Sequence, residues 1–220
     1  MTGPFIIPEP TLRAVREAPP GRATVLLIRH SARGPIPAGE PGNDVLLLPE
    51  GKELARDLGR LVRARLRTVH ASPVRRCIET AESIVDGAEI EANIVEDRHL
   101  GHPGVYVEPG PAAWATWQGL GHERVMAHLV AGDRLAGLAD PVPASRRLVG
   151  HVLATAAGAP GVHLFVTHDS LVTTAAAHCL GQPLGKADWP WYLEALVLLD
   201  GGGAARTASY RRWTAELPWP

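Results

Sequence analysis

The sequence predicts an α/β fold: a three-layer α/β/α sandwich with a mostly parallel central sheet and a small helical insertion. Short apolar runs such as residues 25–28 and 161–167 are bounded by polar and glycine-rich segments, which is typical of strands buried on both faces. Longer segments with apolar residues at helical spacing alternate with these runs. The 220 residues suffice for one substantial domain, which we assign to residues 22–220.

The first elements follow from local signals. Residues 1–21 contain several prolines, and we interpret them as an N-terminal arm with one helical turn around residues 12–17. The first predicted strand covers residues 24–29, and the long loop after it, residues 31–47, is of a length that usually serves a site. Pro49 suits the first position of a helix, and leucines then recur at helical spacing.

The middle of the chain continues the alternation of strands and helices. A second predicted strand, residues 68–71, leads into a helix with Ser72 as its N-cap and Pro73 as its first residue. Residues 112–138 resemble one or two helices, and we place them in an insertion at about 100–140 that caps the ligand crevice. The other predicted elements are strands at 93–95, 161–167, 192–199 and 204–213 and helices at 145–157 and 170–181.

Two of the predicted strands run directly into a histidine. Arg29 and His30 follow the first strand, and His168 and Asp169 follow a later one. The carboxyl ends of parallel strands line the ligand crevice of an open sheet, so we expect these side chains to meet there. Arg29 and the nearby Arg33 disfavour the imidazolium form and bind phosphate well, which favours a nucleophilic His30 in an anion pocket. A structural His30 that bonds to a backbone carbonyl is the alternative for this stretch alone.

A second group of cations begins the helix after residue 71. Arg75 and Arg76 follow Ser72 at the carboxyl end of the second predicted strand. A helix N-terminus with arginines is a ready anion site, so we expect these residues near the crevice of His30.

Composition excludes several function classes. The formal net charge is −1, so nothing draws the whole chain to nucleic acid or to an anionic membrane, and we expect neither partner. We find no signal peptide and no run of 18 apolar residues, which favours a cytoplasmic protein. Cys77 and Cys179 lack metal-binding spacing and are interpreted as buried, reduced thiols. His122, His128 and His151 show no ligand pattern either, so we predict no metal and no cofactor. The sequence does not specify an oligomeric state.

Four blocks of the sequence resemble a known family. The blocks are LLIRHSARGP, LLLPEGKELA, ASPVRRCIETAESI and VTHDSLV, and they occur in the family's order. Together they are similar to the histidine phosphatase superfamily, whose type member is phosphoglycerate mutase. The likeness covers most of the chain except residues 1–21 and the insertion at 100–140. It implies the phosphoglycerate mutase-like sandwich.

The resemblance also implies a role for each matching residue. His30 would be the nucleophile that becomes phosphohistidine. Arg29 and Arg76 would hold the phosphoryl oxygens, and it is Arg76 rather than Arg75 that falls on the motif's arginine. His168, as a cation, would donate to the same phosphate.

Some positions depart from the family's mutase-like branch. Ser31 replaces the glycine after the nucleophile, and His102 stands where that branch has its acidic glutamate. Arg33 and Asp169 instead match the R-H-x-x-R-x-P and His-Asp patterns of the acid-phosphatase branch. The resemblance therefore implies Asp169 as general acid and Arg33 as an additional phosphate ligand, with Glu96 as the reserve candidate for the acid.

The expected activity is hydrolysis of a small-molecule phosphomonoester through a phosphohistidine on His30. Arginines would stabilise the transferred group, so the reaction needs no metal. A phosphomutase and a catalytically weak module that binds phosphate esters are the alternatives. The loop at 31–47 and the insertion at 100–140 would select the substrate.

Overall fold

The computed structural model describes residues 5–37, 39–201 and 205–219. The strands are β1 (Ala23–Arg29), β2 (Leu66–Ala71), β3 (Ile94–Glu96), β4 (Gly161–Thr167), β5 (Ala195–Leu199), β6 (Thr207–Tyr210) and β7 (Trp213–Glu216). The helices are α1 (Glu9–Arg16), α2 (Pro49–Val62), α3 (Arg75–Ala88), α4 (Ala112–Leu120), α5 (His122–Ala131), α6 (Pro141–Ala156) and α7 (Asp169–Leu180), with short 3-10 turns η1 (Arg98–Leu100) and η2 (Lys186–Asp188). This alternation confirms the predicted α/β class.

The strands form one sheet in the order β3-β2-β4-β1-β5-β6-β7. The pairs β1–β4, β2–β3 and β2–β4 are parallel, whereas β1–β5, β5–β6 and β6–β7 are antiparallel. Five strands, β1 to β4 and β6, therefore point one way, and the sheet is mostly parallel in direction. The antiparallel part ends in three strands where the sequence predicted two, because the chain turns after Tyr210 and pairs again at Trp213.

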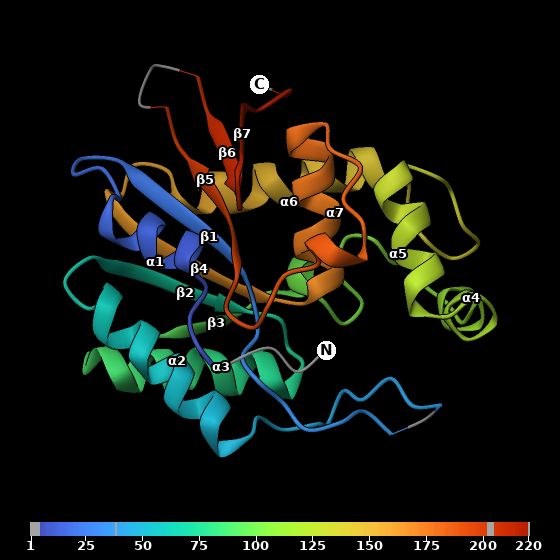
Figure 1. Ribbon diagram of the computed structural model, residues 1–220, viewed down its shortest axis with the longest axis horizontal. Helices are drawn as coiled ribbons and strands as arrows, with labels where there is room; N and C mark the ends of the chain where they lie inside the picture. The colour runs from blue at the N-terminus through green and yellow to red at the C-terminus, as the bar shows by residue number, and fades with distance from the viewer. Residues whose placement is uncertain (1–4, 38, 202–204, 220) are drawn as a thin grey trace.

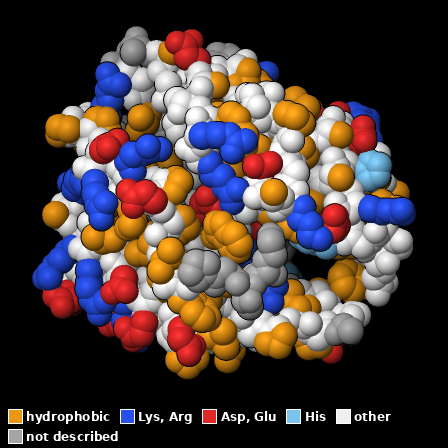
Figure 2. Space-filling model, in the orientation of Figure 1, with side chains coloured by type: hydrophobic (Ala, Val, Ile, Leu, Met, Phe, Trp, Pro, Cys, Tyr) orange, Lys and Arg blue, Asp and Glu red, His pale blue; other side chains and the backbone are white. Residues whose placement is uncertain are grey.

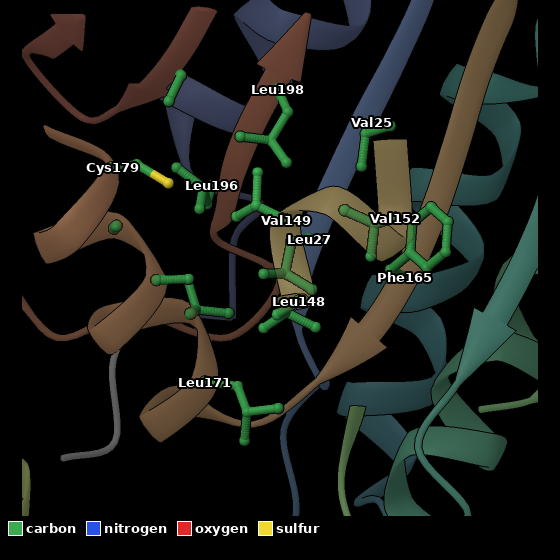
Figure 3. Close-up of a cluster of buried hydrophobic side chains, with 14 of the residues drawn as sticks. Val25, Leu27, Leu148, Val149, Val152, Phe165, Leu171, Cys179, Leu196 and Leu198 are labelled. Carbon is green, nitrogen blue, oxygen red and sulfur yellow. The ribbon is translucent and has the colours of Figure 1, made fainter. Parts of the chain in front are cut away.

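The sheet separates two buried clusters, which gives the predicted three layers (Figure 1). Val25 and Leu27 of β1 face the cluster beneath α6 and α7, as the close-up in Figure 3 shows. Leu26 and Ile28 face the cluster beneath α2 and α3. Every residue of β1 is buried, so this strand has no polar face and its sequence does not alternate.

The register of β1 and β4 brings the two predicted histidines to one edge of the sheet. Arg29 pairs with Thr167 in this parallel ladder, and the His30 backbone N–H donates to the Thr167 carbonyl at 2.8 Å. The residues that follow the two strands therefore leave the sheet side by side, although they are far apart in sequence.

The start of α3 differs from the prediction. The helix begins at Arg75 rather than at Pro73, and Val74 before it has extended backbone angles. Ser72 does not cap the first turn, since its hydroxyl reaches His168 instead, at 3.1 Å, and accepts only a long bond from the Val74 N–H.

The N-terminal segment is more ordered than the predicted arm. Its first four residues lie outside the described part, and α1 then makes two turns instead of one. Thr11 is buried and donates its hydroxyl to the Leu193 carbonyl at 2.9 Å. Val15 and Ala18 belong to the core cluster beneath α2 and α3, so α1 and the residues just after it pack against the sandwich.

The predicted insertion contains α4 and α5 at one end of the molecule, where α5 lies beside α7 and α4 packs against α5 (Figure 1). They have a small cluster of their own around Val125, Leu129 and Leu138. A bond from His178 Nε2 to the Leu129 carbonyl, at 2.9 Å, joins α5 to α7. Among the described helices, none combines the length and apolarity needed to cross a membrane.

Candidate active site

A cavity of about 870 Å³ opens at the carboxyl ends of β1 and β4. Figure 2 shows the hollow on this face, between the part formed by α4 and α5 and the rest of the molecule. We call Arg29, His30, Arg76, His168 and Asp169 the floor of the cavity. The roof is formed by the loop at 31–47, α4, α5 and the segment around η2. The lining residues are Arg29, His30, Arg33, Ile36, Gly39, Glu40, Pro41, Arg76, Trp114, Trp117, Gln118, His122, His168, Asp169, Ser170, Lys186 and Trp189.

His30 is buried and has one ring nitrogen directed at the arginine of α3. Its Nδ1–H donates to the Ser31 carbonyl at 2.8 Å, which leaves the lone pair on Nε2. The Nε–H of Arg76 approaches that Nε2 to 3.1 Å. Burial, followed by the charges of Arg29 and Arg76, holds the pKa of His30 well below its usual value. His30 is therefore a neutral imidazole with a lone pair beside two guanidinium groups.

Arg76 connects the two histidines. It lies in the first turn of α3, is 7% exposed, and places its Nη2 3.2 Å from His168 Nδ1. Its Nη1 also donates to the Gly42 carbonyl of the long loop, at 2.6 Å. The neighbouring Arg75 points outward, toward Glu79 and Glu82. The structure thus distinguishes the two arginines in favour of Arg76, as the motif implies.

His168 is held neutral by its surroundings in the protein alone, whereas the expected cation concerns the ring with a phosphate bound. Its Nδ1 faces Arg76, so the proton lies on Nε2, 3.1 Å from the Ser72 hydroxyl. Burial and the charge of Arg76 lower the pKa of His168 to about 3. Gly101 presses against this ring: a Cβ there would lie 2.8 Å from His168 Nε2 and 2.6 Å from Ser72 Oγ, at a φ of +147°.

Two other arginines, Arg29 and Arg33, line the cavity. Arg29 donates from Nη1 to the Pro190 carbonyl at 2.7 Å and lies over the Tyr192 ring, 4.5 Å from its centroid. Arg33 donates from Nη1 to the Gly34 carbonyl at 2.7 Å. The Nε–H of each is buried and has no partner among the described residues. Buried donors of this kind fit an anion as their acceptor.

Asp169 is the first residue of α7 and lies between Arg29 and the roof. Its Oδ2 is 3.6 Å from Arg29 Nη2, and its Oδ1 accepts from the Ser170 N–H at 2.9 Å. Burial raises the pKa of this carboxyl, but Arg29, His122 and His168 outweigh that effect and leave its pKa below the usual value. Asp169 is therefore ionised at neutral pH.

His122 is a site residue that sequence reasoning missed. It begins α5, and its Nε2 lies 3.8 Å from Asp169 Oδ2. The Trp117 indole N–H donates to its Nδ1 at 3.2 Å, so in the neutral ring the proton sits on Nε2, toward Asp169. No spacing in the sequence relates His122 to Asp169, since the contact depends on how the insertion folds over the sheet.

Other candidates lie elsewhere. Glu96, the reserve acid, is exposed on the edge strand β3 and is not among the residues that line the cavity. His102 lines an adjoining cavity of about 350 Å³, which shares Arg76 and His168 with the main one. Cys77 is buried near His168, and burial raises the pKa of its thiol to about 12, so it stays protonated.

A second histidine cluster forms outside the cavity. Asp97, His99 and His151 bring potential ligand atoms within 4.8 Å of one another, the one such group of three that we find among the described residues. The Asp97 carboxylate already accepts from His99 Nδ1 at 2.9 Å and from His151 Nε2 at 2.6 Å. The three side chains thus satisfy one another, and Asp97 also caps η1 just before Gly101.

These observations define a class of protein. It is an α/β protein in which two histidines and three arginines surround one anion site, between the edge of the sheet and the roof of the cavity. Comparison with known families agrees. The sequence profile of the histidine phosphatase superfamily (branch 1) matches residues 25–203. The chain therefore belongs to the histidine phosphatase superfamily.

Solved structures support the fold assignment. A phosphoglycerate mutase from Bacillus anthracis str. Sterne is 18% identical, with a TM-score of 0.58 over 89% of this chain and 95% of that one. A phosphoserine phosphatase from Entamoeba histolytica is 14% identical, with a TM-score of 0.56 over 88% and 97%. A mycobacterial glucosyl-3-phosphoglycerate phosphatase is 18% identical, with a TM-score of 0.54 over 81% and 90%. No curated protein sequence matches the chain. The family supports phosphatase or mutase activity on phosphate esters.

Proposed function

We propose that this protein is a phosphatase that hydrolyses a phosphomonoester through a phosphohistidine intermediate on His30. The observation that carries the proposal is the convergence of the two histidines on Arg76. Its guanidinium lies 3.1 Å from His30 Nε2 and 3.2 Å from His168 Nδ1. A phosphoryl group in front of His30 Nε2 would meet a neutral nucleophile and a set of cationic donors together.

The first half of the reaction forms the phosphohistidine. The His30 Nε2 lone pair attacks phosphorus, and the bond to the leaving oxygen breaks. Arg29, Arg33 and Arg76 neutralise the phosphoryl oxygens as charge shifts onto them, in a site that burial makes electrostatically strong. His168 supplies a further N–H once the dianion offsets the charge of Arg76.

Asp169 provides the proton for the leaving alkoxide. The bound dianion counteracts Arg29 and raises the pKa of this carboxyl, so Asp169 enters the complex protonated. In the second half, water attacks the phosphohistidine and gives its proton to Asp169. When inorganic phosphate leaves, Arg29 again lowers the pKa of Asp169, so this carboxyl releases its proton to solvent; His30 and Asp169 are then back in their starting states. His122, whose Nε2 lies 3.8 Å from Asp169 Oδ2, is the second candidate for the proton donor.

The test is to trap the intermediate. Wild type mixed rapidly with p-nitrophenyl phosphate should release a burst of nitrophenol, and a denaturing quench should recover phosphohistidine that is labile to acid. The His30→Asn variant should give neither, whereas His70→Asn, a histidine of β2 that does not line the cavity, should give both. Turnover that persists in His30→Asn would refute the proposed nucleophile.

The same experiment separates the two alternatives. A mutase would return the phosphoryl group to an alcohol and yield an isomerised ester instead of inorganic phosphate. A binding module would bind vanadate or phosphate esters without a burst. The feature that favours turnover over binding alone is the neutral His30 ring, whose Nε2 carries a lone pair shared only with the Nε–H of Arg76 among the described contacts.

A further inference from the structure

The cavity extends well beyond the phosphate-binding floor. Its volume of about 870 Å³ is in the range of pockets that enclose a drug-sized molecule, and a phosphoryl group fills only a small part of it. The floor residues are five of the residues that line this space. The rest of the cavity must therefore receive the part of the substrate that leaves.

Three tryptophans form the wall of that remaining space. Trp114 and Trp117 come from α4, and Trp189 follows η2; we call these three the tryptophan wall. The rings of Trp117 and Trp189 both pack near His122, with centroids 6.1 and 5.1 Å from the imidazole. Ile36 and Pro41 of the long loop add further apolar surface.

The wall is not part of a closed core. The Trp114 side chain is 40% exposed while it lines the cavity, and large apolar side chains exposed together mark a surface that binds something. Trp117 packs partly against the small core around Val125 and Leu129, but Trp114 and Trp189 do not belong to that core. The exposed indole surface is therefore available to a ligand.

Charges around the wall do not favour an anionic leaving group. Apart from the floor and Arg33, the charged residues in the described lining are Glu40 and Lys186. Lys186 is paired with Glu123 of α5, which reduces its attraction for another anion. The Glu40 carboxylate would repel a second carboxylate. A small hydroxy acid or amino acid ester thus finds no free cation at this end of the described cavity.

We infer that the substrate, given the proposed phosphatase activity, is the phosphomonoester of a bulky apolar alcohol that carries a flat ring system. Its phosphoryl group lies on the floor, and its ring system stacks on the tryptophan wall. Stacking and burial of one large ring are each favourable in a pocket that excludes water. The wall thus adds selectivity that the floor, which contacts only phosphate, does not provide.

The test compares esters that share the same reacting group. Ethyl phosphate and 2-(2-naphthyl)ethyl phosphate are both primary alkyl esters, so only contacts of the leaving group differ. We expect kcat/KM to be on the order of 10- to 100-fold higher for the naphthyl ester, the gain from burying one large apolar group. Equal values, or a preference for 3-phosphoglycerate, phosphoserine or choline phosphate, would overturn the inference.

Variants assign the selectivity to the wall. Trp114→Ala and Trp189→Ala should each reduce the naphthyl-to-ethyl ratio by about tenfold. Trp219 lies outside the cavity and packs against the buried cluster beneath α6 and α7, so Trp219→Ala should leave the ratio unchanged. Trp117 is left intact because its N–H orients His122. A ratio that stays the same in both wall variants would contradict the assignment.

Binding to the His30→Asn variant separates this inference from the proposed activity. Calorimetry should show tighter binding of the naphthyl ester than of ethyl phosphate to this inactive protein. If wild type hydrolyses no ester, the proposed function fails, yet tighter naphthyl binding still supports the wall as a ring-binding surface. Equal binding of the two esters overturns the inference whether or not wild type is active.

Discussion

The floor and the roof of the cavity obtain their side chains from different kinds of structure. On the floor, the His30 N–H bonds to Thr167 of β4 at 2.8 Å, and the Arg29 N–H bonds to the Glu194 carbonyl at 3.1 Å. The roof consists of a long loop and two short helices with a small core of their own. The groups proposed to act on the phosphoryl group therefore lie where β1 and β4 end and in the first turns of α3 and α7. The groups proposed to contact the leaving part lie where fewer buried residues constrain the chain.

This difference has a consequence for mutation. A change on the floor should alter the chemistry for every ester, because all esters present the same phosphoryl group. A change in the roof should alter the ranking of esters. Each experiment below measures one change against a matched control, beginning with the largest expected effect.

Replacement of Arg76 should have the largest effect. Arg76→Met removes the contact to both histidines, and we expect kcat/KM to fall by about 10²- to 10³-fold for every ester. Arg75→Met, one residue earlier but directed at Glu79 and Glu82, should change it by less than about twofold, since exposed ion pairs contribute little. Steady-state kinetics and thermal melting of both variants make the comparison; similar losses would mean that Arg76 does not hold the phosphate.

Asp169, the proposed proton donor, lies where the floor meets the roof, 3.8 Å from His122. Asp169→Asn should reduce kcat for alkyl esters by roughly 10²-fold and for p-nitrophenyl phosphate by less than tenfold, because nitrophenolate leaves without a proton. If Asp169 is the proton donor, the losses in kcat for alkyl esters and for p-nitrophenyl phosphate should differ less in His122→Gln than in Asp169→Asn. A larger leaving-group dependence in His122→Gln than in Asp169→Asn would make His122 the donor.

Acid should destabilise the protein through the floor. Burial is the main cause that lowers the pKa of His30 in the folded protein. In the unfolded chain this histidine has an ordinary pKa of about 6.5. Below a pH of about 6.5 a proton therefore binds to the unfolded chain but not to the folded protein, which favours unfolding. If His30 stays neutral in the folded protein, lowering the pH from 7.5 to 5 should reduce the free energy of unfolding by about 2 kcal/mol. Urea unfolding at these pH values should show a smaller loss in His30→Asn than in wild type. Equal losses would mean that His30 titrates normally.

Ser31 should have the smallest effect on activity. Its hydroxyl donates to the Gly51 carbonyl of α2 at 2.7 Å, and its backbone N–H donates to Thr80 at 3.0 Å, so the side chain supports the loop and points away from the phosphate. Ser31→Gly should lower the free energy of unfolding by about 1–2 kcal/mol and change kcat/KM by less than about threefold. A large gain in activity would instead mean that the serine hinders the nucleophile.

Much of the floor could be predicted because it depends on local features. The apolar run before His30 requires a buried strand, and parallel strands place their carboxyl ends at one edge, so His30 and His168 had to share it. The order of motifs then distinguished Arg76 from Arg75. Helix starts such as Pro49 were also visible, whereas the start of α3 was wrong because Ser72 bonds to a residue 96 positions away.

The sequence by itself determined the α/β class, the sheet edge that bears the site and the residue types available for phosphate chemistry, because strand burial and helix periodicity are local properties. Only the tertiary structure decided that His168 is neutral, that His122 faces Asp169, that Glu96 lies outside the cavity and that three tryptophans line it. A pKa depends on burial and neighbouring charge, and a cavity wall on how distant segments pack, and neither is encoded at any one position of the chain.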